Sequence, residues 1–251
     1  MATQTSAGPD GKIASRKIKT ATPFASAIPM ATIGLVATAI GFLPTFFMRL
    51  SKVDVPHLIH GWTMIGWLLV ALAQALLIRT RRFRAHRLLG WSAVVLFAGM
   101  VGSSLQMLAL MLSGKSGLPF EAARFFGWSD IADLPLLLIL FGSAIHFRRD
   151  RHLHSRLVAS TVLISMVPAL ARFFNILIWR SFEGLFTAMH PTYLLILGVL
   201  GISILRDRRS GRLEWSLPLA FAWFGCVYAA QWPVWHAPAY IALCQWIAGF
   251  A

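Results

Sequence analysis

The chain has 251 residues, of which 57% are hydrophobic and only 13% are charged. So few charged side chains cannot cover a water-soluble globular domain, in which about 25% of residues are usually charged. The formal net charge of +14 would suit nucleic-acid binding, but the basic residues flank long apolar segments, where anionic lipid is the nearer partner. The composition therefore excludes a soluble globular protein and argues against a nucleic-acid partner.

The first 23 residues are rich in Ser, Thr and Ala and carry several basic side chains. Such a segment predicts a disordered basic tail. Seven apolar segments follow, each long enough to cross about 30 Å of hydrocarbon as a helix. The predicted spans are residues 24–48, 57–78, 88–112, 130–147, 155–179, 186–205 and 215–232. We therefore predict an all-α, polytopic membrane helical bundle formed by residues 24–251.

The last stretch, residues 236–251, is short, contains Pro238 and Gln245, and has no basic residue to anchor it. These features favour a C-terminal interfacial or re-entrant helix over an eighth span.

Most of the 23 Lys and Arg residues fall in the N-terminal tail and in the loops at 79–87, 148–156 and 206–212. Cytoplasmic loops of inner-membrane proteins retain Lys and Arg, so these segments are predicted to lie inside, beside anionic lipids. An odd number of spans then places the N-terminus in the cytoplasm and the C-terminus in the periplasm of a bacterial inner membrane.

The histidines of the predicted outer side suggest a metal or haem site. His57 and His60 share one helix face, His190 lies near the start of the sixth span, and Asp133 lies in the fourth. Imidazole and carboxylate groups bind zinc, copper and non-haem iron, so these four residues predict a metal site. Alternatively, His60 and His190 ligate a haem from opposite helices, or the cluster is a structural polar layer.

Arg172 lies inside the predicted fifth span, roughly 12 Å from its outer end at 1.5 Å per residue, and Asn175 follows it on the same face. An ionisable residue at this depth is by default a hypothesis for a functional site. We expect Asp133 to pair with Arg172, and we expect Arg172, Asn175 and Asp130 to surround the metal ligands. A substrate or proton pathway is the alternative.

On the predicted inner side, His86 opens the third span and His154 opens the fifth. Two imidazoles from neighbouring helices predict a bis-histidine site for haem b. Alternatively, each histidine caps its helix or contacts lipid head groups.

Two motifs are distinctive: His57-Leu-Ile-His60-Gly61, followed by Trp67 and Gln74, and His86-Arg87-Leu88-Leu89-Gly90. In these motifs the chain resembles an uncharacterised family of bacterial multi-pass inner-membrane proteins. The basic loop that ends in His154 and the later Arg172 extend the resemblance over about residues 55–210. The resemblance implies a membrane location and brings no settled activity.

The chain is also similar, more weakly, to the transmembrane di-haem cytochromes b of the ascorbate-reducing type. That likeness implies haem ligation by His86 and His154 on alternate helices. In the outer pair the chain departs from that family, because the fourth span has no outer histidine and His190 on the sixth span would have to substitute for it.

These features predict a membrane protein that binds a redox metal or haem and serves in electron transfer or as a membrane oxidoreductase. Its expected partners are a quinone or a redox protein. Two alternatives remain open: a transporter of a small solute or of protons, and a non-catalytic accessory subunit of a larger membrane complex. The sequence does not decide whether the protein is an enzyme.

Overall fold

The structure is a computed structural model that describes residues 27–251, and within this range it contains helices and no strand. The predicted basic tail at residues 1–23 lies outside the described residues. The elements are α1 (Ala27–Gly41), η1 (Phe47–Lys52), α2 (Val55–Arg79), α3 (Phe83–Leu112), α4 (Phe120–His146), α5 (Arg151–Phe174), η2 (Asn175–Trp179), α6 (Phe182–Arg209), α7 (Ser216–Trp235) and α8 (Pro238–Ala248).

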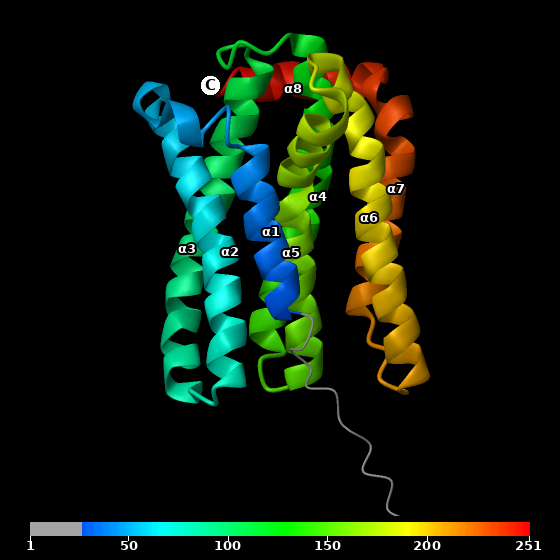
Figure 1. Ribbon diagram of the computed structural model, residues 1–251. Helices are drawn as coiled ribbons and strands as arrows, with labels where there is room; N and C mark the ends of the chain where they lie inside the picture. The colour runs from blue at the N-terminus through cyan, green and yellow to red at the C-terminus, as the bar shows by residue number, and fades with distance from the viewer. Residues whose placement is uncertain (1–26) are drawn as a thin grey trace, which may run out of the picture.

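Helices α1 to α7 run along a common direction, and α8 lies across one end of the bundle (Figure 1). The α2–α3 hairpin forms one side and the α6–α7 pair forms the other, with α1, α4 and α5 between them. Helix α5 is central and contacts α1, α2, α4, α6 and α7. Its buried Ser160, Thr161 and Ser165 hydroxyls donate to carbonyls of α5 itself, which allows polar residues inside the bundle.

Five helices are long and apolar enough to cross a membrane, namely α2, α3, α4, α6 and the continuous α5–η2 segment. At least half of the most apolar stretch of each is not buried inside the protein, so a large apolar surface faces outward. Such a surface is typical of contact with lipid rather than water. The predicted membrane class is therefore supported. Helices α1, with 15 residues, and α7, with 20, are not among these five helices, so the predicted number of seven spans is supported only in part.

Two predicted spans, the first and the fourth, differ most from the helices in the structure. The first, 24–48, is shorter, because α1 ends at Gly41 and the chain turns into η1. Pro44 follows and cannot donate the backbone hydrogen bond that would extend the helix. The fourth, predicted from residue 130, begins at Phe120. Charged residues lie near its start, but Arg124 is buried there and donates to the Trp235 carbonyl.

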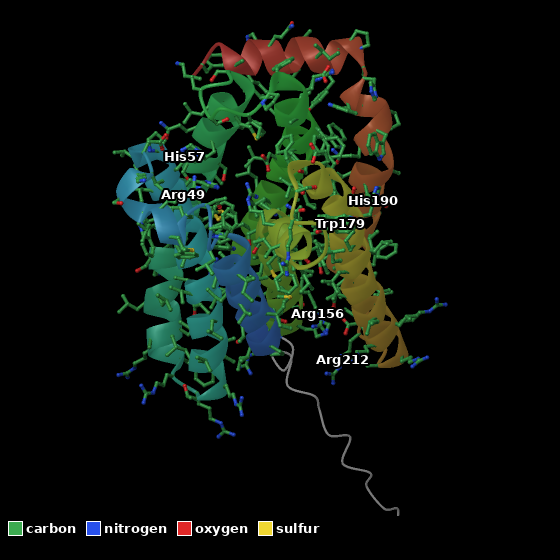
Figure 2. All side chains as sticks on the ribbon, turned by 45° about the horizontal axis from the view of Figure 1, so that its top comes forward. Arg49, His57, Arg156, Trp179, His190 and Arg212 are labelled. Atoms are coloured by element: carbon green, nitrogen blue, oxygen red, sulfur yellow. The ribbon has the colours of Figure 1, made fainter. Side chains whose placement is uncertain are left out.

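The arginine-rich connections α2–α3, α4–α5 and α6–α7 all lie at the end of the bundle where α1 begins, which we call the arginine-rich end (Figure 1). Arg156 and Arg212 mark this end in Figure 2. The C-terminus lies at the opposite end, beside α8, which we call the α8 end. The clustering of basic loops on one side agrees with the sequence prediction.

Helices α4 and α7 are joined by side chains of one helix that donate to backbone carbonyls of the other. The pairs are Arg124–Trp235, Trp128–Val227, Trp223–Ala132, Gln231–Phe125 and Trp235–Glu121, with donor–acceptor distances from 2.6 to 3.1 Å. In a water-free environment each buried donor needs an acceptor within the protein. These hydrogen bonds therefore hold α4, including the segment that carries Asp133, against α7.

Candidate functional site

A cavity of about 490 Å³ lies towards the α8 end, between α1, η1, α2 and α5. We call it the η1 pocket. Its walls are largely apolar, and its polar and charged lining includes three sequence-predicted residues, His57, His60 and Arg172. It also includes Arg49 and Lys52, which the sequence analysis did not single out as site residues. A cavity of this volume is typical of small-molecule sites, which are about 300–1,000 Å³.

The turn after α1 builds the mouth of the pocket. Phe46 packs over Gly61, where even a Cβ atom would collide with its ring at 2.5 Å. Asp54 caps α2 by accepting a hydrogen bond from the His57 backbone nitrogen at 3.0 Å, and its carboxylate lies 2.6 Å from His57 Nδ1. These hydrogen bonds, the backbone one foremost, lower the pKa of the Asp54 carboxyl. Asp54 is therefore engaged with His57 rather than free to neutralise the other cations.

Arg172 lies deeper, on α5. Its Nη1 donates to the Pro168 carbonyl at 3.2 Å, and its guanidinium carbon lies 4.5 Å from the centre of the Phe42 ring. No carboxylate oxygen in residues 27–251 lies within 4.0 Å of its nitrogens. The predicted Arg172–Asp133 pair is therefore wrong. Arg172 faces α1 across Phe42, whereas Asp133 lies on the α4 face near Trp223 of α7.

His60 lines the η1 pocket and also faces α3, where its Nδ1 lies 3.3 Å from Ser103 Oγ. His190 lies elsewhere: its Nδ1 is 2.7 Å from the Tyr228 hydroxyl on α7. Figure 2 shows His57 and His190 on different sides of the bundle. His57 and His60 lie on α2 and His190 lies on α6, and the central helix α5 contacts both of these helices. A similar depth along α2 and α6 therefore does not make these histidine side chains neighbours.

The four predicted metal ligands, His57, His60, His190 and Asp133, are therefore not brought together. Within residues 27–251, no group of three or more His, Cys, Asp and Glu side chains is placed to hold a metal ion. Asn175 does not line the η1 pocket. It begins η2, and its side-chain oxygen packs against Gly184 of α6.

A second polar cluster involves Asp130, Asp133 and Tyr193. Asp133 is 5% exposed and its Oδ1 has no hydrogen-bond partner, and Tyr193 is 0% exposed with an unpartnered hydroxyl, within the described part of the chain. Tyr193 is within electrostatic reach of both carboxylates. Asp130 has an exposed side chain and is close enough to Arg172 for the two charges to interact. Of this cluster, Asp130 therefore interacts electrostatically with a residue that lines the η1 pocket.

The inner histidines, His86 on α3 and His154 on α5, are close enough for their charges to interact. His154 Nδ1 lies 2.8 Å from the Ala144 carbonyl, an arrangement in which Nδ1 donates and Nε2 keeps its lone pair. His86 Nδ1 is buried without a hydrogen-bond partner in residues 27–251. Both rings therefore keep a nitrogen that is free to act as a ligand.

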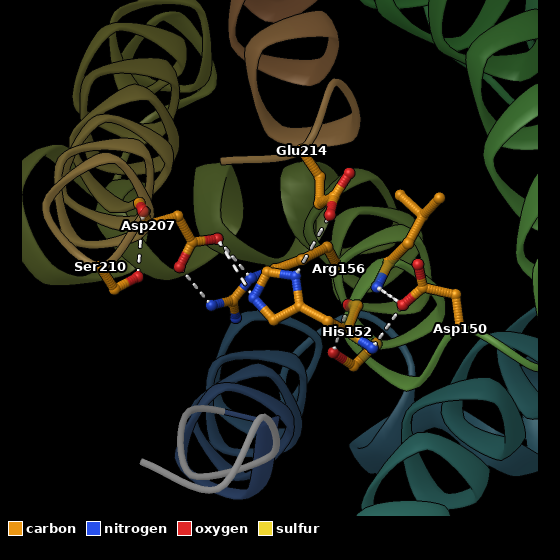
Figure 3. Close-up of polar contacts among 8 residues, drawn as sticks. Asp150, His152, Arg156, Asp207, Ser210 and Glu214 are labelled. Carbon is orange, nitrogen blue, oxygen red and sulfur yellow. Dashed lines mark hydrogen bonds and ion pairs between the residues drawn. The ribbon is translucent and has the colours of Figure 1, made fainter. Parts of the chain in front are cut away.

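A further cluster at the arginine-rich end was missed by the sequence interpretation (Figure 3). Arg156 and Asp207 form a double hydrogen-bonded ion pair. A His152 ring nitrogen lies 3.9 Å from Asp207, and the other lies 3.9 Å from Glu214. The available signal was Asp207 itself, the one acidic residue in the basic segment 206–212.

No known protein family, curated protein or solved structure matches this chain. The resemblances drawn from its motifs therefore stay predictions, and the site has to be interpreted from its own geometry.

Proposed function

We propose that this protein is a multi-pass membrane transporter that binds a small organic anion in the η1 pocket. The observation that carries the proposal is that Arg172 lines the pocket without a direct ion pair: no carboxylate oxygen in residues 27–251 lies within 4.0 Å of it, and Asp130 acts on its charge only from a greater distance. Arg49 and Lys52 add two cations to the same lining, against the single carboxylate of Asp54. A cation inside a bilayer is costly unless it is paired, and a bound anion supplies the missing partner.

The lining also indicates the chemical class of the ligand. A guanidinium matches the two oxygens of a carboxylate, and the walls near Arg172 include Phe42, Met64 and Leu68. A carboxylate attached to an apolar group would satisfy both parts of the pocket. Inorganic anions would leave the apolar walls in contact with water, which is unfavourable.

The proposed orientation has α1 to α7 crossing a bacterial inner membrane, with the arginine-rich end in the cytoplasm and the η1 pocket on the periplasmic side. The clustered basic connections support it. Single cysteines at Ser116 and Ser210, with Cys226 and Cys244 replaced by Ala, test it. A membrane-impermeant maleimide should label Ser116→Cys in intact spheroplasts and Ser210→Cys only after lysis. The reverse pattern would invert the proposed orientation.

Ligand binding is tested by the thermal stability of the purified protein in detergent with benzoate and octanoate, each compared with its neutral amide. We expect the carboxylates to raise the melting temperature and the amides not to. Arg172→Gln should abolish the increase. Arg180→Gln is the matched control, because Arg180 lies outside the η1 pocket and donates to the Ile176 carbonyl of its own helix. Equal stabilisation of the wild type and Arg172→Gln would refute the site.

A second candidate function, electron transfer through haem b bound by His86 and His154, is favoured by one observation. The Ala144 carbonyl fixes His154 with Nε2 available, and such second hydrogen bonds usually orient metal-ligating histidines. A bound haem would supply reversible one-electron chemistry. Visible spectra of the purified protein, before and after dithionite, test for it. His154→Ala should remove the haem bands, and His146→Ala, an exposed histidine at the end of α4, should retain them.

A further inference from the structure

We propose that the η1 pocket is specific for hydroxy carboxylates, with the ligand carboxylate bound to Arg172 and the ligand hydroxyl donating a hydrogen bond to His60 Nε2. The proposal rests on the anion-binding function proposed above and names the substrate class of the same site. Its basis is the set of hydrogen-bond donors and acceptors that the pocket presents to a ligand.

The hydroxyl groups beside His60 determine which of its ring nitrogens carries a hydrogen. His60 Nδ1 lies 3.3 Å from Ser103 Oγ of α3. Ser103 has one hydroxyl hydrogen and two nearer acceptors for it, the Met100 carbonyl and Thr63 Oγ1, each at 3.0 Å. The Thr63 hydroxyl in turn donates to the His60 carbonyl at 2.9 Å. Ser103 Oγ is therefore the acceptor for Nδ1–H, and the neutral ring keeps its lone pair on Nε2.

The Nε2 lone pair is available to a molecule in the pocket. His60 belongs to the lining of the η1 pocket. Its Nε2 has no hydrogen-bond partner in residues 27–251, and it is not one of the fully enclosed polar atoms of this range. A histidine nitrogen in this state accepts a hydrogen bond from a ligand and offers none to a carboxylate.

Two further polar side chains of the pocket, Thr38 and Ser165, are also acceptors. Both are buried residues of the lining. The Thr38 hydroxyl donates to the Gly34 carbonyl and the Ser165 hydroxyl to the Val162 carbonyl, both at 2.8 Å within their own helices. Since each hydroxyl has used its single hydrogen, it offers only oxygen lone pairs to a ligand. A simple carboxylate has no donor and leaves all of these acceptors unsatisfied.

Arg172 supplies the donors of the buried lining. Its Nη1 donates to the Pro168 carbonyl at 3.2 Å, and its remaining guanidinium hydrogens face no carboxylate within 4.0 Å in the described part of the chain. Arg172 and His60 line the same pocket and are close enough for their charges to interact. A ligand that carries a carboxylate and a nearby donor therefore matches both side chains, because buried polar groups are normally hydrogen-bonded.

The charges of the pocket favour a hydroxyl over an ammonium as this donor. An amino acid would place its ammonium among three cations, Arg172, Arg49 and Lys52. Asp54 is the one carboxylate of the lining, and it is already held by His57 at 2.6 Å. Like charges repel strongly where the dielectric constant is low. A neutral hydroxyl meets the acceptors without this repulsion.

The proposal is tested on the wild type by calorimetric titration with a series of phenyl-substituted acids. Mandelate and tropate carry a hydroxyl that the reference ligand, phenylacetate, lacks. We expect at least one of them to bind about two- to tenfold more tightly than phenylacetate, the gain of one neutral hydrogen bond. The methyl ether of that hydroxy acid should lose the gain, and phenylglycine should bind more weakly than phenylacetate. Equal affinities, a gain retained in the ether, or tighter binding of phenylglycine would each overturn the proposal.

The role of His60 is tested with two histidine variants of the same pocket. His60→Phe removes the acceptor, so the hydroxy acid should fall to the affinity of phenylacetate, while phenylacetate itself still binds. His57→Phe is the matched control and should keep the preference, because His57 Nδ1 is engaged with Asp54. A preference that survives His60→Phe would refute the assigned acceptor. If the wild type binds none of these acids, the proposed anion-binding function fails as well. If it binds them all equally, only the hydroxyl specificity fails.

Discussion

Arg156 on α5 and Asp207 on α6 form a two-pronged ion pair, with Nε 2.7 Å from Oδ2 and Nη2 2.6 Å from Oδ1. The Asp207 residue is only 4% exposed, and Figure 3 shows the pair facing His152 at the arginine-rich end. Parallel hydrogen bonds between a guanidinium and a carboxylate fix both distance and orientation. The pair therefore sets the spacing between α5 and α6 at this end of the bundle.

Breaking this pair on one side should destabilise the fold. Asp207→Asn leaves Arg156 partly buried without its counter-charge, and loss of one partner of a buried pair costs about 3–5 kcal/mol. We expect a lower unfolding free energy, measured by denaturant titration in detergent micelles. The Arg156→Gln/Asp207→Asn double variant should lose less than the sum of the single changes. Arg209→Gln, at an exposed site nearby, should have little effect.

Two glycines should respond in opposite ways to alanine. A Cβ at Gly41 would lie 2.7 Å from the Ala169 carbonyl oxygen, whereas a Cβ at Gly102 meets no atom within 4 Å. Gly41→Ala must push α1 away from α5, a type of overpacking that costs about 1–3 kcal/mol. Gly102→Ala lies in open space on α3 and should be neutral, or stabilising by up to about 1 kcal/mol. Equal melting temperatures for the two variants would contradict the packing of α1 on α5.

Phe42 should tune ligand affinity through Arg172. The guanidinium lies 4.5 Å from the Phe42 ring centre, a cation–π contact worth about 0.5–1 kcal/mol. Phe42→Leu removes the surface that orients Arg172, so we expect benzoate affinity to fall about two- to five-fold. Phe47→Leu is the control, because Phe47 also lines the η1 pocket. A larger loss in Phe47→Leu than in Phe42→Leu would argue against this role.

Stability should depend on the ionisation of Asp54 in acid. The pKa of this carboxyl is lowered from 3.8 by hydrogen bonds from His57, first its backbone nitrogen and then its ring. A lowered folded-state pKa adds stability above the ordinary value, and that stability is lost as the pH falls through the folded-state pKa. Asp54→Ala removes the α2 cap, typically worth about 1 kcal/mol at neutral pH. The melting temperatures of wild type and variant should therefore converge in acid, and a constant difference would disprove the ionised cap.

The helical membrane class could be predicted from the sequence, because it follows from local properties. Runs of apolar residues such as 57–78 and 88–112 must form helices in lipid, since only a helix satisfies its own backbone there. They correspond to α2 and α3 in the structure. Charged residues in loops were equally informative, since the three arginine-rich connections lie at one end. Prediction failed where a charge belonged to a helix, as Arg124 does in α4.

The candidate site could be predicted only in part. His57, His60 and Arg172 were identified from their types and positions, and the structure places them in one pocket with Arg49 and Lys52. Sequence gives the depth of a residue along its helix and leaves open the order of helices around the bundle. That order puts Arg172 against Phe42 instead of Asp133, and it leaves His190 beside Tyr228, away from His60. The helical membrane class and the clustering of basic loops at one end follow from local chemistry in the sequence. The neighbours of each polar side chain follow only from tertiary packing.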